Sequence, residues 1–195
     1  MPDNLQKISK FLFRNRSYTP VPWLILMLWF ADPNPPGILL GLLLVCLGEG
    51  LRAWGVSYAG VETRTTGDVG ASRLVTSGPF AFVRNPLYLG NIIIYTGLGV
   101  MSWAWWPWLP LAAVIWFLVQ YYLIVKEEER FLEQTFGEEY RQYRKRVPAF
   151  FPRLSPYVSP HQQTNDWRGA FRSEARTLQA IGAVSLIIVV MYFVR

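Results

Sequence analysis

The fold class follows from residues 85–125, which read NPLYLGNIIIYTGLGVMSWAWWPWLPLAAVIWFLVQYYLIV. These 41 consecutive residues contain no Lys, Arg, Asp or Glu. A helix needs roughly 20 apolar residues to cross a bilayer, so the stretch is long enough for two crossings. Four Trp and two Pro within residues 103–110 predict a helix break at a membrane–water interface. The stretch therefore predicts a hairpin of two membrane-spanning helices.

Three further uncharged runs flank this hairpin, at residues 17–31, 33–48 and 177–194. Residues 32–37, Asp-Pro-Asn-Pro-Pro-Gly, cannot continue a helix and separate the first two runs. The first run is short for a crossing, so we expect it to be tilted, extended by its flanks or partly inserted. Residues 167–178 carry apolar side chains on one helical face beside several Arg, which predicts a short helix on the membrane surface. We expect an all-α, polytopic membrane bundle of about five transmembrane helices.

Composition and charge agree with a multi-pass membrane protein. Hydrophobic residues make up 52% of the chain and charged residues 16%, against about 25% charged residues in soluble domains. The basic residues lie between apolar runs and form no stripe on a soluble face, so no nucleic-acid partner is expected. With the N-terminus cytoplasmic, seventeen of the nineteen Lys and Arg fall on the cytoplasmic side. With no apparent signal peptide in residues 1–17, this bias predicts a prokaryotic inner (cell) membrane.

The 195 residues suffice for one domain, residues 1–195. We expect a motif core at 74–152 and a C-terminal segment at 166–195 that contains the last transmembrane helix. Cys46 is the single Cys and lies in an apolar run, so a disulfide framework or a Cys-based metal site within the chain is excluded. His161 is the only His and lies in a polar loop, so no metal site is expected.

Two polar clusters flank the predicted hairpin. The first is residues 76–90, which contain Arg84, Asn85 and Tyr88, and the second is residues 127–152, which begin with three Glu. Apolar residues recur at helical spacing over residues 126–146, with a break or bend expected at Gly137. Because the helices of a hairpin return to the same membrane boundary, the clusters should share one pocket on the cytoplasmic side.

A pocket of this kind suits S-adenosylmethionine. Carboxylates can bind its ammonium and ribose hydroxyls, and Arg or a backbone nest can bind its carboxylate. An aromatic wall suits its adenine, and an electron-rich surround suits its sulfonium. Methyl transfer gains mainly from alignment of nucleophile, methyl carbon and sulfur, and from exclusion of water.

The two clusters resemble the isoprenylcysteine carboxyl methyltransferase family and its relatives among phospholipid and thiol methyltransferases. The family pattern reads Leu-Val-Thr-x-Gly, then Arg-His-Pro-x-Tyr-x-Gly, then, after a crossing, Glu-Glu-x-x-Leu-x-x-x-Phe-Gly-x-x-Tyr-x-x-Tyr and Val-Pro. The matching residues of this chain are Leu74, Val75, Thr76, Gly78, Arg84, Pro86, Tyr88, Gly90, Glu128, Glu129, Leu132, Phe136, Gly137, Tyr140, Tyr143, Val147 and Pro148. The resemblance implies S-adenosyl-L-methionine as cofactor. The residues expected to contact it are Arg84, Asn85, Pro86, Tyr88, Glu128, Glu129, Tyr140 and Tyr143.

Three positions depart from the family pattern. Asn85 stands at the family His and cannot titrate, so it cannot serve as a general base. Ser72 replaces a second His of the prenylcysteine enzymes, and Ile124 replaces an Arg thought to serve the substrate carboxylate. The loss of that Arg argues against a carboxylate acceptor. The sequence identifies no catalytic residue.

Glu49 and Arg52 lie one turn apart inside the second apolar helix. Ionisable residues within a membrane span are by default candidates for function, so both are assigned to substrate binding. The alternative is a local ion pair in which the Arg52 side chain extends to the interface.

The resulting prediction is a membrane methyltransferase that acts on a lipophilic acceptor of isoprenylcysteine, phospholipid amine or thiol type. Its partners would be the bilayer and a lipid or lipid-like substrate entering from it. The main alternative is an NADPH-dependent membrane reductase of the sterol reductase type, whose motifs are similar in this region. A third possibility is a non-catalytic scaffold, in which Glu127–Glu129 would be only a solvated first turn, Arg84 a topology anchor and the tyrosines interfacial.

Overall fold

A computed structural model describes residues 3–60, 73–159 and 162–194. Over these residues the chain is helical and contains no strand. Ser72 and His161 lie outside the described residues. The elements are α1 (Asp3–Asn15), α2 (Val21–Trp29), α3 (Pro35–Ala59), a 3-10 turn η2 (Gly78–Ala81), α4 (Pro86–Ser102), α5 (Trp108–Arg146) and α6 (Trp167–Val194).

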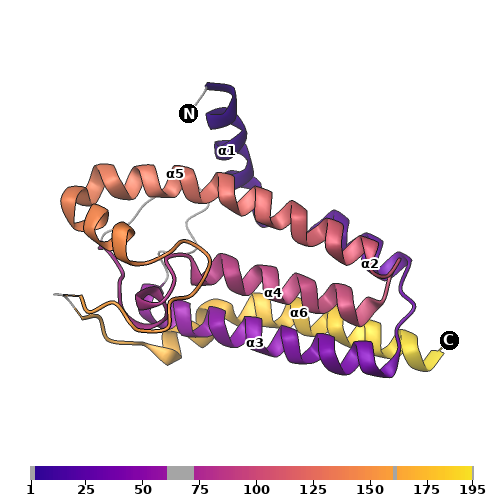
Figure 1. The fold of residues 1–195 in the computed structure, drawn as a ribbon. Coiled ribbons are helices and arrows are strands. Elements are labelled where there is room, and N and C mark those ends of the chain that lie inside the picture. The colour runs from indigo at the N-terminus through magenta and orange to yellow at the C-terminus, as the bar shows by residue number, and fades with distance from the viewer. Residues whose placement is uncertain (1–2, 61–72, 160–161, 195) are drawn as a thin grey trace.

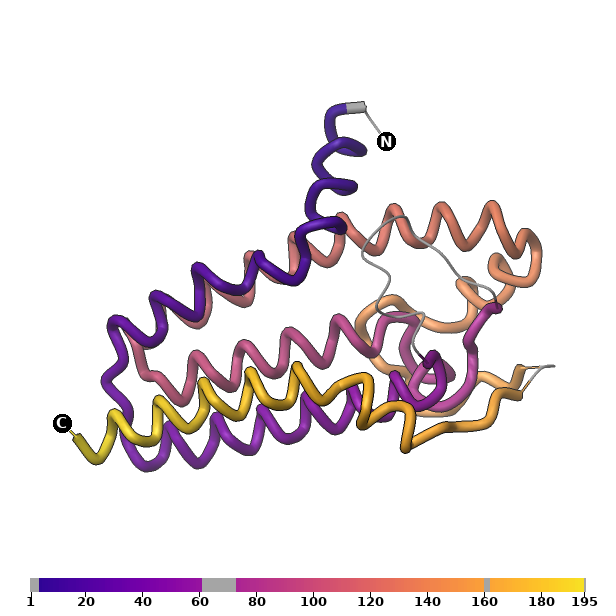
Figure 2. The backbone as a smooth tube through the Cα atoms, turned by 180° about the vertical axis from the view of Figure 1, so that it is seen from behind, coloured from indigo at the N-terminus to yellow at the C-terminus, as the bar shows by residue number. Residues whose placement is uncertain are grey.

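The long helices run roughly alongside one another, as Figure 1 shows. Helix α3 packs along α4 and against α6, and α5 and α2 each pack on α4. Helix α1 projects away from this bundle and packs on α5 (Figure 2). The second half of α5 extends past the bundle and turns back, together with η2 and the loop that follows α5 (Figure 1). The second half of α5, η2 and the loop after α5 therefore lie together at one end of the bundle.

Three helices, α3, α5 and α6, are long and apolar enough to cross a membrane, and α4 is a shorter apolar helix. The chain is therefore a helical membrane protein, as its sequence predicts. Five spanning helices are not confirmed, because α2 has only 9 residues and is about 14 Å long against a core of about 30 Å. The uncharged part of α5 ends at Val125. Residues 126–146 are rich in charged side chains, whose burial in lipid is costly, and so they belong outside the apolar core of the bilayer.

The predicted helix breaks are confirmed. The Asn34 side chain caps α3 by accepting a hydrogen bond from the Gly37 amide at 2.8 Å. Helix α4 ends at Ser102, followed by Trp103 in the left-handed region, and α5 begins at Trp108. Inside α5, Gly137 has φ 53° and ψ −123°, a conformation open to glycine, and the chain kinks there.

Helices α3 and α4 approach closely because glycines face each other. A Cβ on Gly41 would lie 2.4 Å from the Gly97 carbonyl oxygen, and one on Gly48 would lie 2.7 Å from the Gly90 carbonyl oxygen. Backbones can pack this tightly in a membrane helix pair only where both helices present small residues. This contact fixes α3 beside α4 and so positions Arg52 next to the first turns of α4.

Two elements differ from expectation. The predicted surface helix at 167–178 is wrong as a separate element, because it forms the first turns of a continuous α6 (Trp167–Val194). No Pro interrupts this stretch, and Asp166 caps it by accepting a hydrogen bond from the Gly169 amide at 2.9 Å. Helix α1 is not predicted by the sequence pattern. It is docked by the Ser9 hydroxyl, which donates to the Leu123 carbonyl at 2.8 Å.

Candidate functional site

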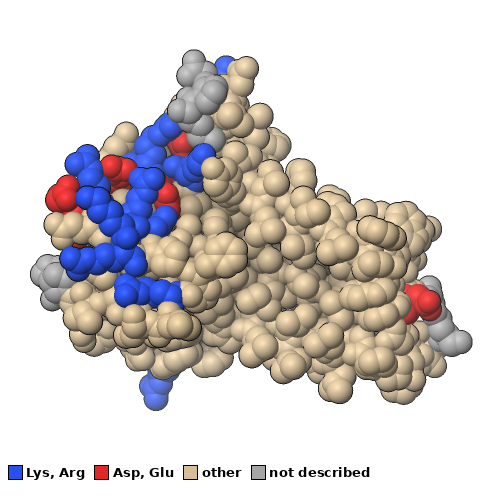
Figure 3. Space-filling model, in the orientation of Figure 1, with Lys and Arg blue, Asp and Glu red and all other residues tan. Residues whose placement is uncertain are grey.

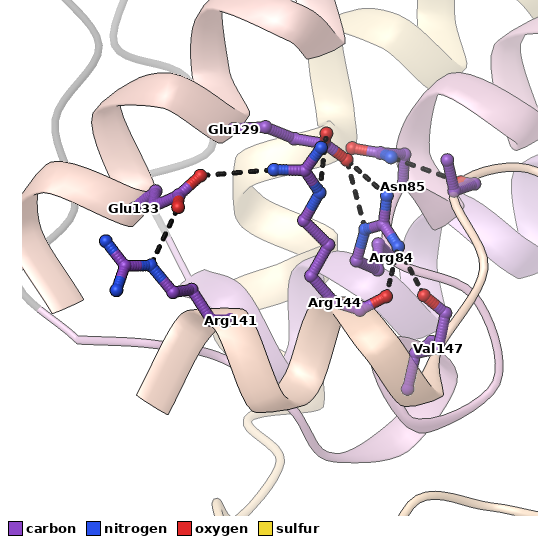
Figure 4. Close-up of polar contacts among 8 residues, drawn as sticks. Arg84, Asn85, Glu129, Glu133, Arg141, Arg144 and Val147 are labelled. Atoms are coloured by element: carbon purple, nitrogen blue, oxygen red, sulfur yellow. Dashed lines mark hydrogen bonds and ion pairs between the residues drawn. The ribbon is translucent and has the colours of Figure 1, made fainter. Parts of the chain in front are cut away.

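The two polar clusters meet, as the sequence predicts. Arg84 donates from Nε and Nη2 to Glu129 Oε1 at 3.0 and 2.5 Å, and from Nη1 to the Arg144 and Val147 carbonyls (Figure 4). The Arg84 and Glu129 side chains are 11% and 13% exposed. One guanidinium therefore joins the start of α4 to both arms of the bent α5.

The turned-back end of α5 is held by further contacts. Beyond the Gly137 kink, Arg141 and Arg144 reach back to Glu133, with nitrogen–oxygen distances of 2.8 and 3.1 Å (Figure 4). Hydrogen bonding from Arg141 lowers the pKa of the Glu133 carboxyl. The Tyr143 hydroxyl donates to the Phe80 carbonyl at 2.7 Å, and burial raises the pKa of Tyr143. These contacts hold the part of α5 beyond the Gly137 kink, residues 138–146, over the end of the bundle. We refer to this segment as the cap.

The loop after α5 closes the cap from the other side. The Arg84 amide donates to the Pro148 carbonyl at 2.9 Å, and the Asn85 side-chain amide donates to the Ala149 carbonyl at 3.1 Å. Asn85 thus fills the family His position with a hydrogen-bonding role that needs no titration.

A cavity of about 670 Å³ lies under the cap. In its cap half, Tyr88 donates a hydrogen bond to Glu128 Oε1 at 2.5 Å. Burial raises the pKa of the Glu128 carboxyl to about 7, which the Tyr88 hydrogen bond opposes. Rings of Phe80, Tyr140 and Tyr143 also line this half. Its surface therefore combines one carboxylate with aromatic walls.

The same cavity continues between the helices. Arg52 on α3 forms an ion pair with Glu174 on α6 at 2.6 Å, with 12% and 2% of the side chains exposed. Arg52 also donates to Asn91 Oδ1 at 2.5 Å, and Asn91 donates to the Tyr121 hydroxyl at 3.1 Å. Tyr121 stacks on Tyr88, with ring centroids 4.7 Å apart. A continuous chain of contacts therefore connects Glu174 to the Tyr88–Glu128 pair.

Apolar residues at the start of α2 and along α6 also line this inner half: Pro20, Val21, Leu24, Ala180, Ile181 and Val184. Arg16, Arg176 and Thr177 line the same cavity. The cavity is thus polar at the cap and at the Arg52–Glu174 pair, and along α6 it combines apolar side chains with Arg176 and Thr177.

The predicted site residues differ in whether their side chains line the cavity. Seven of the eight predicted cofactor residues line the cavity: Arg84, Asn85, Pro86, Tyr88, Glu128, Tyr140 and Tyr143. Glu129 does not line it and instead pairs with Arg84. Of the predicted substrate residues, Arg52 lines the cavity, while both carboxylate oxygens of Glu49 are buried and make no hydrogen bond. Ile124, at the position of the family Arg, is fully buried in the core.

The predicted alternative of a local Glu49–Arg52 ion pair is wrong, because Arg52 pairs with Glu174. Sequence reasoning missed Glu174 and Asn91, since Glu174 lies in a segment assigned to the surface and Asn91 has no motif partner. Among the described residues, no group of three or more His, Cys, Asp or Glu could hold a metal ion.

Comparison with known proteins places the chain in a family. The sequence profile of the phospholipid methyltransferase family matches residues 36–139, which is more than half of the chain. The chain belongs to this family. The match begins in α3 and ends just beyond the kink of α5, so it contains the Arg84–Glu129 and Tyr88–Glu128 contacts.

Curated relatives support this assignment. The chain is 37% identical over 126 residues to the cobalt-zinc-cadmium resistance protein CzcN of Cupriavidus metallidurans, covering 64% of this chain and 53% of that protein. It is 35% identical over 115 residues to the protein-S-isoprenylcysteine O-methyltransferase of Schizosaccharomyces pombe, covering 55% and 46%. The human protein of that name is 36% identical over 120 residues, covering 57% and 40%. The chain spans about half the length of the curated relatives it matches. No solved structure matches.

Proposed function

We propose that this protein is a membrane methyltransferase that transfers a methyl group from S-adenosylmethionine to a lipophilic acceptor. One observation carries the proposal: a single cavity joins the Tyr88–Glu128 pair under the polar cap to an apolar region bordered by α2 and α6. A charged, water-soluble cofactor and a lipid-like acceptor can therefore share one cavity. Family membership and the names of two relatives support methyl transfer.

The residues present fit the cofactor. Glu128 would bind the cofactor's ammonium group, Tyr88 would hold that carboxylate in place, and Phe80, Tyr140 and Tyr143 would offer rings to its adenine. Arg84 and Asn85 line the same space, yet their hydrogen bonds hold the cap together. They would serve the cofactor chiefly by fixing the walls of its pocket.

When bound, S-adenosylmethionine supplies an electrophilic methyl group on a positively charged sulfur. Glu128 and Tyr88 would hold the cofactor so that this methyl group faces a lone pair of the acceptor. The chain's own contribution is to align the two molecules and exclude water. Alignment and exclusion of water both suit this cavity, because Tyr121 and the Arg52–Glu174 pair lie along it between the helices.

We also propose that the cap faces the cytoplasm and that the N-terminus is cytoplasmic. In Figure 3 the Lys and Arg side chains visible on this face gather toward the end that carries the cap. An excess of basic residues on one side of a membrane protein favours the cytoplasmic side.

The experiment is transfer of an isotopically labelled methyl group from S-adenosylmethionine to bacterial membrane lipids by the purified protein. We expect label in the organic phase with wild type and at least a tenfold loss with Glu128→Gln. The matched control is Glu138→Gln, whose side chain is 62% exposed beside Arg141 and should leave transfer unchanged. Equal transfer by wild type and Glu128→Gln would contradict the proposed site. The comparisons give no support to the reductase alternative.

A further inference from the structure

A second cavity lies on a different face of α5 from the cavity under the cap. It has a volume of about 1020 Å³ and is bordered by both arms of the bent α5 and by Leu5 of α1. Among the described residues, none that lines this second cavity also lines the first. The second cavity, which we call the outer groove, is therefore a separate candidate for a binding site.

The charged side chains that line the outer groove are mostly basic. They are Lys126, Arg130, Arg141, Arg144, Glu129 and Glu133, with a net formal charge of +2. The Glu133 carboxylate is engaged by Arg141 and Arg144, at nitrogen–oxygen distances of 2.8 and 3.1 Å. The Glu129 carboxylate pairs with Arg84. The acidic side chains of the groove are thus occupied within the protein, and the excess charge is positive.

Lys126 and Arg130 are the basic side chains of the groove that can bind a ligand. The Lys126 ammonium lies 4.4 Å from the centroid of the Tyr122 ring and, within the described part of the chain, forms no ion pair. The Arg130 guanidinium lies 3.6 Å from the Glu127 carboxylate, outside hydrogen-bond distance, and the Arg130 side chain is 37% exposed. Because Lys126 and Arg130 are four residues apart in α5, their side chains lie side by side on one face of the helix.

The outer groove lies at the boundary of the membrane. The uncharged part of α5 ends at Val125, directly before Lys126. Toward the bilayer, the same face of α5 continues as Tyr122, Val119 and Ile115, each more than half exposed. A helix face that changes from apolar to basic at this level matches the polarity of a phospholipid, whose acyl chains lie beneath a phosphate group.

Helix α1 lies at the same level. It stands steeply across α5 in Figures 1 and 2, and Ser9 docks it on the Leu123 carbonyl, three residues before Lys126. Apolar and basic side chains are both exposed along it: Lys7, Ile8, Lys10, Phe11 and Arg14. This composition is typical of a helix that lies in the membrane interface beside anionic lipids. Since Leu5 lines the groove, α1 forms one of its walls.

We propose that the outer groove binds an anionic phospholipid of the leaflet that adjoins the cap, with the phosphate between Lys126 and Arg130 and an acyl chain along Val119 and Ile115. Basic pockets beside membrane helices favour head groups with a net negative charge over zwitterionic ones. The lipid is held outside the cavity under the cap, so it is a bound component and not the methyl acceptor. This inference does not depend on the proposed function.

The test is native mass spectrometry of the detergent-purified protein with equal amounts of phosphatidylglycerol and phosphatidylcholine that carry the same acyl chains. We expect wild type to bind phosphatidylglycerol at least about tenfold more tightly. Lys126→Gln with Arg130→Gln should reduce this preference to about twofold or less. Lys126→Arg with Arg130→Lys retains both charges and should keep the wild-type preference.

The matched control is Arg168→Gln with Arg172→Gln. These two exposed residues are also four apart, on the first turns of α6, and line neither cavity. The control should keep the preference for phosphatidylglycerol within about twofold of wild type. In all variants, Tm measured by intrinsic Trp fluorescence should stay within about 2 °C of wild type, because the substituted side chains are at least partly exposed.

A further arm separates a lipid from a free phosphate compound. Millimolar glycerol phosphate, which offers the head group without acyl chains, should leave phosphatidylglycerol bound to the wild-type protein. Displacement of the lipid by glycerol phosphate would overturn the assignment to a phospholipid. Equal affinity of wild type for the two lipids, an unchanged preference in the Lys126→Gln, Arg130→Gln variant, or an equal loss in the control would overturn the inference as a whole.

Discussion

Glu128 and Glu129 are adjacent in the sequence but have different partners, and this predicts different consequences for the same substitution. Glu129 accepts two hydrogen bonds from Arg84 and does not line the cavity. Glu128 accepts one from Tyr88 and does line it. Replacement of Glu129 by Gln should mainly destabilise the fold, and replacement of Glu128 by Gln should mainly weaken cofactor binding.

The loss in free energy of unfolding expected for Glu129→Gln follows from the burial of the Glu129 side chain. Removal of one partner of a buried ion pair costs about 3–5 kcal/mol. Gln keeps one oxygen that can accept from Arg84, which also retains the Arg144 and Val147 carbonyls, so we expect about 2–3 kcal/mol. In a chain of this length, 1 kcal/mol shifts Tm by about 2–4 °C, which gives a fall of about 4–12 °C.

Glu128→Gln should behave differently. The Tyr88 hydroxyl can donate to the Gln oxygen, so Tm should change by no more than about 2 °C. Loss of the charge removes a charge-assisted hydrogen bond to the cofactor's ammonium group, which lowers affinity about tenfold or more.

Both quantities are measured on protein in detergent, with Tm from intrinsic Trp fluorescence and affinity for S-adenosylhomocysteine from calorimetry well below Tm. Arg141→Gln is the control for Glu129→Gln, since it breaks an ion pair on the same turned-back end of α5 whose Arg side chain is 55% exposed, and its Tm should stay near that of wild type. If Glu128→Gln lowers Tm as much as Glu129→Gln while affinity falls equally in both, the separation of roles is refuted.

Three further predictions concern individual contacts. If only ionised Glu128 binds the ammonium, its pKa of about 7 makes affinity for S-adenosylhomocysteine rise about tenfold from pH 6 to pH 8, and calorimetry of Glu128→Gln should show a flat profile. Gly41→Ala places a Cβ 2.3 Å from Met101 Cγ and should cost about 1–3 kcal/mol in a thermal scan, whereas Gly50→Ala, with no atom within 4 Å, should leave Tm unchanged or raised. Tyr143→Phe removes the donor to the Phe80 carbonyl and should cost about 1–2 kcal/mol, so an unaltered Tm would argue against that hydrogen bond.

The hairpin and the meeting of the two polar clusters are predictable from the sequence because they depend on the length of an uncharged run and on the position of the break within it. An uncharged run of 41 residues with a Trp- and Pro-rich break allows few arrangements. A hairpin then returns Arg84 and Tyr88 to the level of Glu128 and Glu129, and the hydrogen bonds of the structure connect these pairs. Gly137 is likewise predictable, since glycine inside a helical pattern is the residue that tolerates a positive φ.

The remaining features depend on packing between distant segments. Glu129 reads as a cofactor residue by motif, and only the closeness of Arg84 shows that its carboxylate is engaged in the fold. Glu174 is separated from Arg52 by 122 residues, and its neighbours Arg172 and Arg176 favour a surface helix in the sequence pattern. Only the continuation of α6 alongside α3 places its carboxylate in the cavity.

The central claim is that the cavity beneath the cap binds S-adenosylmethionine through Glu128. The most direct test is calorimetric binding of S-adenosylhomocysteine to the detergent-purified protein at pH 8, with NADPH as the parallel ligand and Glu128→Ala as the variant. We predict binding of the adenosyl ligand by wild type, loss of that binding in the variant, and no heat from NADPH. Binding of NADPH without binding of S-adenosylhomocysteine would contradict the claim.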